Sequence, residues 1–171
     1  PVQIEGSGKG RDRSDKPEYK VKAAIAFSFN NTANCIEYYH NSSWLEYGGT
    51  PDRAVRIAFV AELDRQIKLR DKYKGSEAKI TFTDVQDSLI LVSSSFSTQT
   101  SYENQTKKAI NNKYIYEFMS DLLRSRLEVW FIENKAEGDR VIEQILINKR
   151  SRETAEKQRL NMRKKLMGSV D

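Results

Sequence analysis

An alternation of residue types between Val21 and Phe29 restricts the possible folds more than any other stretch of the sequence. Every second residue there is apolar, in the order Val21, Ala23, Ile25, Phe27 and Phe29. Because successive side chains of a strand point to opposite faces of a sheet, this two-residue period predicts a β-strand with one buried face. The rest of the chain must supply apolar side chains to cover that face.

Two further strands are predicted. Asn30-Asn31-Thr32 has turn chemistry, so residues 35–39 are expected to return beside the first strand as a hairpin. Residues 89–92 form a short apolar run followed by three serines, which indicates a buried strand. By contrast, residues 1–18 are polar and contain three glycines and Pro17, so we expect a flexible loop there. The Gly-Ser-Gly-Lys-Gly run at 6–10 lacks the spacing of a phosphate-binding loop.

Helices are predicted on both sides of the apolar run. After the Gly48-Gly49 turn, Thr50 is expected to cap a helix with Pro51 at its first position, ending near Lys74-Gly75. Thr83 is expected to cap a short turn, and Asn112 a helix whose inward residues end at Phe131. These elements predict a mixed α/β domain, in which a small sheet is backed by helices.

The last predicted helix changes character along its length. Residues 134–138 are expected to interrupt the preceding helix, and Val141 begins a new apolar stripe that is lost after Ile147. A helix that is polar all round is not buried in a domain core. We therefore expect the residues after 147 to project outwards or to bridge to a neighbour.

The positive charge of the chain is concentrated in that same segment. The formal net charge is +5, whereas residues 148–165 alone carry eight Lys or Arg and two Glu, a net charge of +6. Such a segment attracts phosphates through counterion release, which favours a nucleic-acid partner. The alternative that stays open is a solvated helix face whose charges only keep it soluble.

Composition excludes several classes of site. The chain has one cysteine, Cys35, and one histidine, His40, so an internal disulfide and a Cys-rich zinc site are excluded. A Ser-His-Asp triad and a His-cluster metal site are poorly supplied, and we predict no metal site. No apolar run is long enough to span a membrane, and no signal peptide precedes the first strand. Since the chain begins at Pro1, we expect an excised part of a longer cytoplasmic protein.

Residues 97–111 have little apolar content and no period. The chain has 171 residues, which make about one domain, and so long a loop inside a compact domain is usually functional or disordered. Gln105, Thr106, Lys107 and Lys108 lie in its middle.

Read in order along nearly the whole chain, these landmarks resemble the transducer domain of the B subunit of bacterial type IIA DNA topoisomerases, DNA gyrase B or topoisomerase IV B. Ile25 to Asn30 resembles the first transducer strand, and Gly48-Gly49-Thr50 the Gly-Gly-Thr turn before a long helix. Gln105-Thr106-Lys107, with Tyr102 upstream, resembles the family's Gln-Thr-Lys loop. Residues 148–156 resemble the helix leading to the DNA-cleavage half.

The resemblance implies a fold and three parts of the chain. The fold is that of the second domain of small-subunit ribosomal protein S-five, an α/β (α+β) fold with a left-handed βαβ crossover and helices on one face of a small mixed sheet. Residues 1–18 would lead in from a missing ATPase domain, residues 19–147 would form the transducer domain, and residues 148–171 would form a basic exit helix towards a missing cleavage domain.

The resemblance also implies a site. The ATP pocket, with its Mg²⁺, belongs to the missing domain, and Lys107 would be the catalytic contact to the γ-phosphate with Gln105 as a second contact. The residues implied for DNA contact are Arg150, Arg152, Arg159, Arg163, Lys164 and Lys165. The implied partners are DNA, the flanking ATPase and cleavage domains, the A subunit, and a second copy in a full-length homodimer. The isolated chain is expected to lack ATPase activity.

Three positions depart from the family pattern. The family commonly has His where this chain has Pro51, Arg facing the DNA where it has Glu46, and Leu-Gly where it has Ile110-Asn111. A carboxylate repels phosphate, which puts DNA contact at Glu46 in doubt and indicates a divergent member.

Three alternatives stay open. Mismatch-repair and heat-shock ATPases of the same superfamily share this second domain and also use a reaching lysine, although the Gly-Gly-Thr turn and the basic helix favour a topoisomerase. A stand-alone nucleic-acid-binding module would bind without nucleotide. A structural scaffold with no ligand would leave the long polar loop unexplained.

Overall fold

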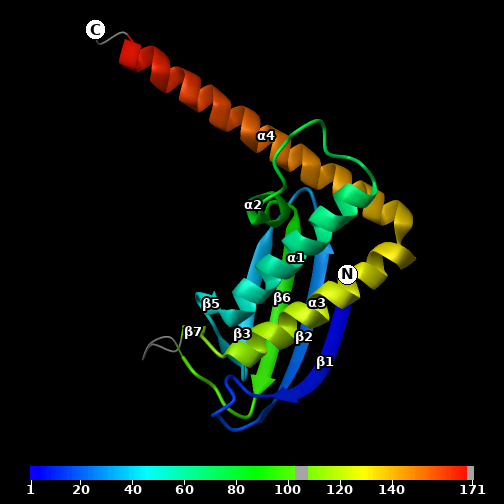
Figure 1. Ribbon diagram of the computed structural model, residues 1–171, viewed down its shortest axis with the longest axis vertical. Coiled ribbons are helices and arrows are strands. Elements are labelled where there is room, and N and C mark those ends of the chain that lie inside the picture. The colour runs from blue at the N-terminus through cyan, green and yellow to red at the C-terminus, as the bar shows by residue number, and fades with distance from the viewer. Residues whose placement is uncertain (103–107, 169–171) are drawn as a thin grey trace.

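The computed structural model of the protein describes residues 1–102 and 108–168 (Figure 1). The elements in chain order are β1 (Val2–Gly10), β2 (Tyr19–Phe29), β3 (Cys35–His40), β4 (Ser43–Trp44), β5 (Gly48–Gly49), α1 (Thr50–Leu69), α2 (Phe82–Gln86), β6 (Leu89–Ser97), β7 (Ala109–Ile110), α3 (Lys113–Glu133) and α4 (Lys135–Gly168). The predicted fold class, a mixed α/β domain with a long C-terminal helix, is confirmed.

Five strands form one mixed sheet in the order β1-β2-β6-β3-β4. β2 is antiparallel to both β1 and β6, whereas β3 is parallel to β6. Helices α1 and α3 lie side by side over one face of this sheet, and the other face carries no described helix (Figure 1). β5 and β7 form a separate parallel pair.

The core lies between the covered face and the helices. The alternation predicted in β2 is confirmed, because Val21, Ala23, Ile25 and Phe27 are all buried. The ring of Phe27 packs edge-to-face on Phe59 of α1, with 5.3 Å between ring centroids. The alternate residues of β2, which include Lys20, Lys22 and Ala24, are exposed on the opposite face.

The predicted hairpin between β2 and β3 is wrong. Residues 35–40 form a strand, but β6 lies between β2 and β3, and β3 pairs with β6 in parallel. The chain thus passes from β3 through α1 and α2 to β6, which is a βαβ unit. Alternation specifies which face of a strand is buried but not which strand lies beside it, so the sequence could not exclude the hairpin.

The prediction of a flexible loop over residues 1–18 is wrong for its first half. Val2–Gly10 pairs antiparallel with β2 along its whole length, from Val2 opposite Phe27 to Gly10 opposite Tyr19. Gly6, Gly8 and Gly10 are on the face towards α3. A Cβ on Gly10 would overlap the ring of Tyr114, so the missing side chains let the helix lie against the strand.

Helix starts differ in detail from the predictions. The N-cap of α1 is Gly49, at φ 80°, with Pro51 in the first turn, so Thr50 does not cap. The cap of α2 is Thr81, which forms a reciprocal capping box with Asp84, so the prediction of Thr83 is wrong. Asn112 is the N-cap residue of α3 as predicted, but its side chain makes no capping hydrogen bond, and Asp12 accepts the backbone N–H of Tyr114 instead. The interruption predicted at 134–138 shrinks to Asn134.

Helix α4 leaves the domain as predicted. Its buried residues end at Lys149, and its C-terminal part, orange to red in Figure 1, extends beyond the sheet and the other helices. The helix is continuous from Lys135 to Gly168, so there is no structural break at the boundary expected between residues 147 and 148.

Candidate functional site

The segment that holds Gln105 and Lys107 has well-defined flanks. Both residues lie outside the described residues, whereas the residues that follow Lys107 pair with the turn before α1. Ala109 and Ile110 form β7 opposite Gly48 and Gly49, and both are buried. The backbone N–H of Tyr47 also donates to the carbonyl oxygen of Lys108, at 3.0 Å. The C-terminal flank is therefore part of the packed domain.

Asn112 closes the segment from the other side. Its side-chain oxygen accepts a hydrogen bond from the backbone N–H of Ser101 at 2.7 Å. The backbone N–H of Asn111 donates to the carbonyl oxygen of Ser101 at 2.8 Å, and Tyr102 forms an isolated antiparallel bridge with Ile110. The two flanks of the segment are thus joined to each other at Tyr102 and Ile110.

A buried histidine fixes the chain just before this closure. His40 is fully buried, with Nδ1 2.7 Å from Oγ of Ser95 and Nε2 3.0 Å from Oγ of Ser97 and 3.2 Å from Oγ1 of Thr100. Burial lowers the pKa of His40 to about 4, so the ring is neutral at pH 7. A neutral ring both donates and accepts, which suits three hydroxyl partners.

Lys108, next to Lys107, is paired. Its Nζ lies 2.7 Å from Oε2 of Glu46 and 5.9 Å from the ring centroid of Tyr47. The hydrogen bond with Glu46 raises the pKa of Lys108 above its usual value. Glu46, one of the departures from the family pattern, therefore has a partner within this chain.

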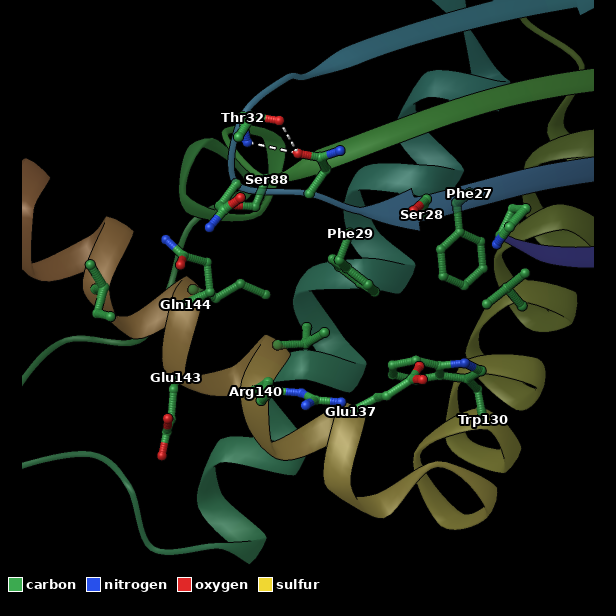
Figure 2. A pocket seen from close by; sticks show the side chains of 17 residues that line it. Phe27, Ser28, Phe29, Thr32, Ser88, Trp130, Glu137, Arg140, Glu143 and Gln144 are labelled. Carbon is green, nitrogen blue, oxygen red and sulfur yellow. Dashed lines mark hydrogen bonds between the residues drawn. The ribbon is translucent and has the colours of Figure 1, made fainter.

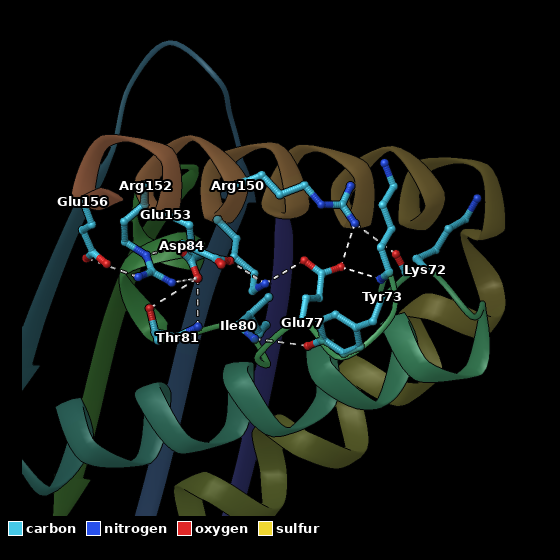
Figure 3. Close-up of polar contacts among 12 residues, drawn as sticks. Lys72, Tyr73, Glu77, Ile80, Thr81, Asp84, Arg150, Arg152, Glu153 and Glu156 are labelled. Carbon is cyan, nitrogen blue, oxygen red and sulfur yellow. Dashed lines mark hydrogen bonds and ion pairs between the residues drawn. The ribbon is translucent and has the colours of Figure 1, made fainter. Parts of the chain in front are cut away.

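The base of α4 is attached to the domain by charged groups (Figure 3). Nε and Nη2 of Arg152 lie 2.7 and 3.2 Å from the two carboxylate oxygens of Asp84, whose side chain is fully buried. Arg150 donates to Glu77 at 2.9 Å and to the carbonyl oxygen of Lys72 at 3.1 Å. Two of the six residues expected at DNA are therefore paired within the domain.

Lys149 precedes these two arginines in α4 and is completely buried. Its Nζ is 2.8 Å from Glu77 and 2.5 Å from Glu153. Burial alone would lower the pKa of Lys149, but its contacts with the carboxylates of Glu153 and Glu77 raise it, and the amine is charged. Hydrogen bonding to Arg150, and then to Lys149, holds the pKa of Glu77 at about 2.

The sequence gives little indication of a role for Lys149 or its carboxylate partners. The one available signal is its place on the stripe that contains Ile142 and Ile145, at spacings of three and four residues. We call the group Glu77, Asp84, Lys149, Arg150 and Arg152 the α4 clamp.

Beyond the α4 clamp the helix is exposed and cationic. The remaining residues expected at DNA are Arg159, Arg163, Lys164 and Lys165, and within residues 1–102 and 108–168 none of them lies within ion-pair distance of a carboxylate. The residues expected at DNA therefore fall into two groups. The two arginines at the start of the projecting part are ion-paired within the domain, whereas the other four cations have no carboxylate partner among the described residues.

One cavity has no counterpart in the sequence-based expectations. It has a volume of about 780 Å³ and lies where the end of β2 meets α3 and the first turns of α4 (Figure 2). Phe29 and Trp130 form an aromatic wall, with 5.9 Å between ring centroids, and Arg140 and Gln144 of α4 are on its polar side. Its residues come from five separate segments of the chain and share no motif.

The described part of the chain lacks two kinds of feature. No group of three or more His, Cys, Asp or Glu side chains there could hold a metal ion. No described helix is both long and apolar enough to cross a membrane.

Several proteins of known identity are similar to this chain. A DNA gyrase B protein from Metamycoplasma arthritidis is 28% identical over 96% of this chain and 26% of its own length. One from Spiroplasma citri is 24% identical over 86% of this chain and 23% of its own length. The chain thus spans about a quarter of the length of these curated relatives.

Solved structures share the fold. The 43K ATPase domain of Thermus thermophilus gyrase B, solved with an aminocoumarin, matches 92% of this chain and 40% of its own, with a TM-score of 0.71 and 22% identity. The topoisomerase IV ATP-binding domain of Francisella tularensis matches 85% of this chain and 39% of its own, with a TM-score of 0.64 and 19% identity.

The sequence model of one family covers most of the chain. It is described as DNA gyrase B, and it matches residues 3–161, from β1 into the projecting part of α4. The chain therefore belongs to the DNA gyrase B family.

Proposed function

We propose that this chain is the transducer domain of the B subunit of an ATP-dependent type II DNA topoisomerase. Family membership supports this proposal, and so do solved relatives described as ATPase and ATP-binding domains. The chain matches only 40% and 39% of those two structures, so we place the ATP pocket and its Mg²⁺ in a preceding domain. The longer protein would act in the cytoplasm as a homodimer with an A subunit.

The part of this chain in the nucleotide site would be Gln105 and Lys107. The amide of Gln105 and the ammonium of Lys107 are hydrogen-bond donors, and the terminal phosphoryl group of ATP gathers negative charge as it is transferred. This donor set fits such a group. When bound in the preceding domain, ATP with Mg²⁺ supplies the phosphoryl group and its leaving group.

The observation that carries this proposal is the closure of the segment at Tyr102 and Ile110. A loop that contributes one cation to a pocket on another domain needs a rigid attachment to its own domain, because only then does a movement of the loop move that domain. Such an attachment is present on both flanks, through the β5–β7 pair, Asn112 and His40. Release of the γ-phosphate would remove the partner of Lys107 and let the two domains rotate.

Lys107→Ala in the full-length protein tests the site, with Lys108→Ala as the matched control. Loss of one positioned donor typically lowers turnover by about 100-fold or more. We expect that loss for Lys107→Ala, with nucleotide binding retained, and near-normal turnover for Lys108→Ala because Lys108 is engaged with Glu46. Normal turnover by Lys107→Ala overturns the assignment. The isolated chain should hydrolyse no ATP.

DNA contact is the second part of the proposed function. The four cations of the projecting helix, Arg159, Arg163, Lys164 and Lys165, are the residues best supported for binding backbone phosphates. Arg150 and Arg152 would have to leave Glu77 and Asp84 to do so, which makes them weaker candidates. Strand passage would bring a DNA segment past this helix.

A further inference from the structure

The face of the sheet that no described helix covers has an unusual composition. Strand register places outward residues of neighbouring strands opposite one another. Lys22 of β2 is opposite Phe96 of β6, and Ser94 of β6 is opposite Tyr39 of β3, which is in turn opposite Trp44 of β4. Three aromatic side chains therefore occupy one face of three adjacent strands.

Two of these aromatic rings are exposed, whereas Tyr39 is half-buried and its hydroxyl donates to Glu37 at 3.0 Å. Trp44 is 58% exposed and Phe96 is 43% exposed. Among the described residues, no other aromatic ring packs on Phe96 or Trp44, and no cation lies over either ring. Directly opposite residues of a sheet lie about 5 Å apart and diagonal ones about 7–8 Å. The three rings are thus within reach of successive units of one extended chain.

The small residues of β1 and β2 leave a hollow beside Phe96. Its volume is about 670 Å³, and Ser7, Lys22, Ala24 and Phe96 are among the residues around it. This volume lies within the range of small-molecule sites, about 300–1,000 Å³. The hollow therefore has an aromatic wall, a floor of small side chains and a cation at its edge.

Charge is arranged unevenly along the same face. Lys20 and Lys22 are exposed at the end near Phe96, and neither forms an ion pair within residues 1–102 and 108–168. Of the carboxylates near this face, Glu5 borders the hollow on the side away from Lys20, and Glu37 lies further along. Glu18, at the lysine end, is already paired with Lys9 and Arg11. An anionic chain would therefore place its charged groups at Lys20 and Lys22 and its apolar groups on the aromatic rings.

We propose that this open sheet face binds single-stranded nucleic acid, with an unpaired base against the ring of Phe96 and the adjoining phosphate at Lys22. Bases stack on exposed aromatic rings whatever their sequence, while lysines follow the backbone. A duplex cannot use this site, because its bases are already stacked and paired. The inference does not depend on the proposed nucleotide contact or on the projecting helix.

Binding of a labelled single-stranded oligo(dT) to the 171-residue chain, followed by fluorescence anisotropy, tests this inference. Stacking of one base is worth about 1–3 kcal/mol, which corresponds to about 5- to 150-fold in affinity. We expect Phe96→Leu, which removes the ring but keeps an apolar side chain, to weaken binding by at least about fivefold. Lys22→Gln should weaken it and reduce its salt dependence.

A second variant separates this face from α4. The quadruple variant Arg159→Gln, Arg163→Gln, Lys164→Gln and Lys165→Gln should lose binding of a duplex of equal length while keeping the effect of Phe96→Leu on oligo(dT). Thermal melting checks that each variant is folded. The proposal is overturned if neither Phe96→Leu nor Lys22→Gln changes the affinity for oligo(dT). It is also overturned if Phe96→Leu weakens the binding of duplex and single strand equally.

Discussion

Arg152 donates two hydrogen bonds to the buried carboxylate of Asp84, at 2.7 and 3.2 Å, and so joins the long helix α4 to the first turn of α2. The same carboxylate accepts the backbone N–H of Thr81, so one side chain both caps α2 and holds α4. Asn148 of α4 adds hydrogen bonds to the carbonyl oxygen of Asp84 and to Ser88.

Replacing Asp84 should therefore destabilise the domain strongly. Removing one partner of a buried ion pair typically costs about 3–5 kcal/mol, because the other charge loses its partner. We expect Asp84→Asn to lower the free energy of unfolding by at least about 2 kcal/mol in urea denaturation, since the amide keeps part of the hydrogen bonding. Arg159→Gln, an exposed arginine on the same helix, should change it by less than about 0.5 kcal/mol. Equal effects of the two substitutions would show that the α4 clamp does not stabilise the fold.

The glycines of β1 should tolerate no side chain on their inward face. A Cβ on Gly8 would lie 2.7 Å from Oη of Tyr114, and one on Gly10 would overlap the ring of the same tyrosine. Overpacking of this kind costs about 1–3 kcal/mol. We expect Gly10→Ala to lower the melting temperature, and Tyr114→Leu to restore part of the loss in the double variant.

Ser7→Ala is the matched control for that pair. Ser7 lies on the opposite, exposed face of the same strand, so the substitution should leave the melting temperature nearly unchanged. No rescue by Tyr114→Leu would contradict the packing of α3 on these glycines.

Two groups should make stability depend on pH in separate windows. His40 is neutral in the fold, with its pKa lowered from 6.5 to about 4, so the unfolded chain binds a proton more readily. Its contribution, on the order of 3 kcal/mol, is present above pH 6.5 and is lost as pH falls towards 4. The pKa of Glu77 is lowered from 4.5 to about 2, so its contribution to stability is present above pH 4.5 and is lost as the pH falls towards 2.

Urea denaturation at a series of pH values measures both windows. His40→Gln should flatten the slope between pH 6.5 and 4, and Glu77→Gln the slope below pH 4.5. The hydroxyl partners of His40 are retained in the first variant. If the free energy of unfolding of the His40→Gln variant still falls with the same slope between pH 6.5 and 4, groups other than His40 cause that pH dependence.

The projecting part of α4 should set the salt dependence of duplex binding. Each phosphate contact contributes about −0.9 to the slope of log affinity against log salt concentration. The quadruple glutamine variant at 159, 163, 164 and 165 should reduce the steepness by up to about 3–4 and weaken binding at low salt. An unchanged slope, measured by anisotropy, would remove the DNA assignment from this helix.

The sequence predicted those elements whose signal is local. The alternation in β2 and the loss of the apolar stripe after Ile147 each depend on neighbouring residues, and both predictions are confirmed. The apolar run of β6 forms a strand as predicted, but this strand is buried on one face only, since Val92 is exposed. The place of β3 could not be predicted, because it depends on pairing with β6, which lies far along the chain. β1 has no apolar alternation of its own, because glycines occupy three of its inward positions and side chains of α3 fill the space.

The candidate site shows the same division. The positions of the long polar loop and the basic helix are visible in composition. The pairing of Arg150 with Glu77 and of Arg152 with Asp84 is not, because each pair joins residues about 70 positions apart. The hydrogen bond between Asp12 and the start of α3 is of the same kind, since Asp12 lies in a stretch whose composition predicts only a loop.

The attachment of α4 near Arg152 has a mechanical consequence. Residues 153–168 continue as one helix beyond the α4 clamp and span roughly 24 Å at 1.5 Å per residue. A tilt of about 10° at the attachment displaces the far end by about 4 Å, so a rearrangement of α2 too small to disturb the sheet is amplified along the arm. The geometry converts a local change of angle into a movement comparable to the spacing between strands.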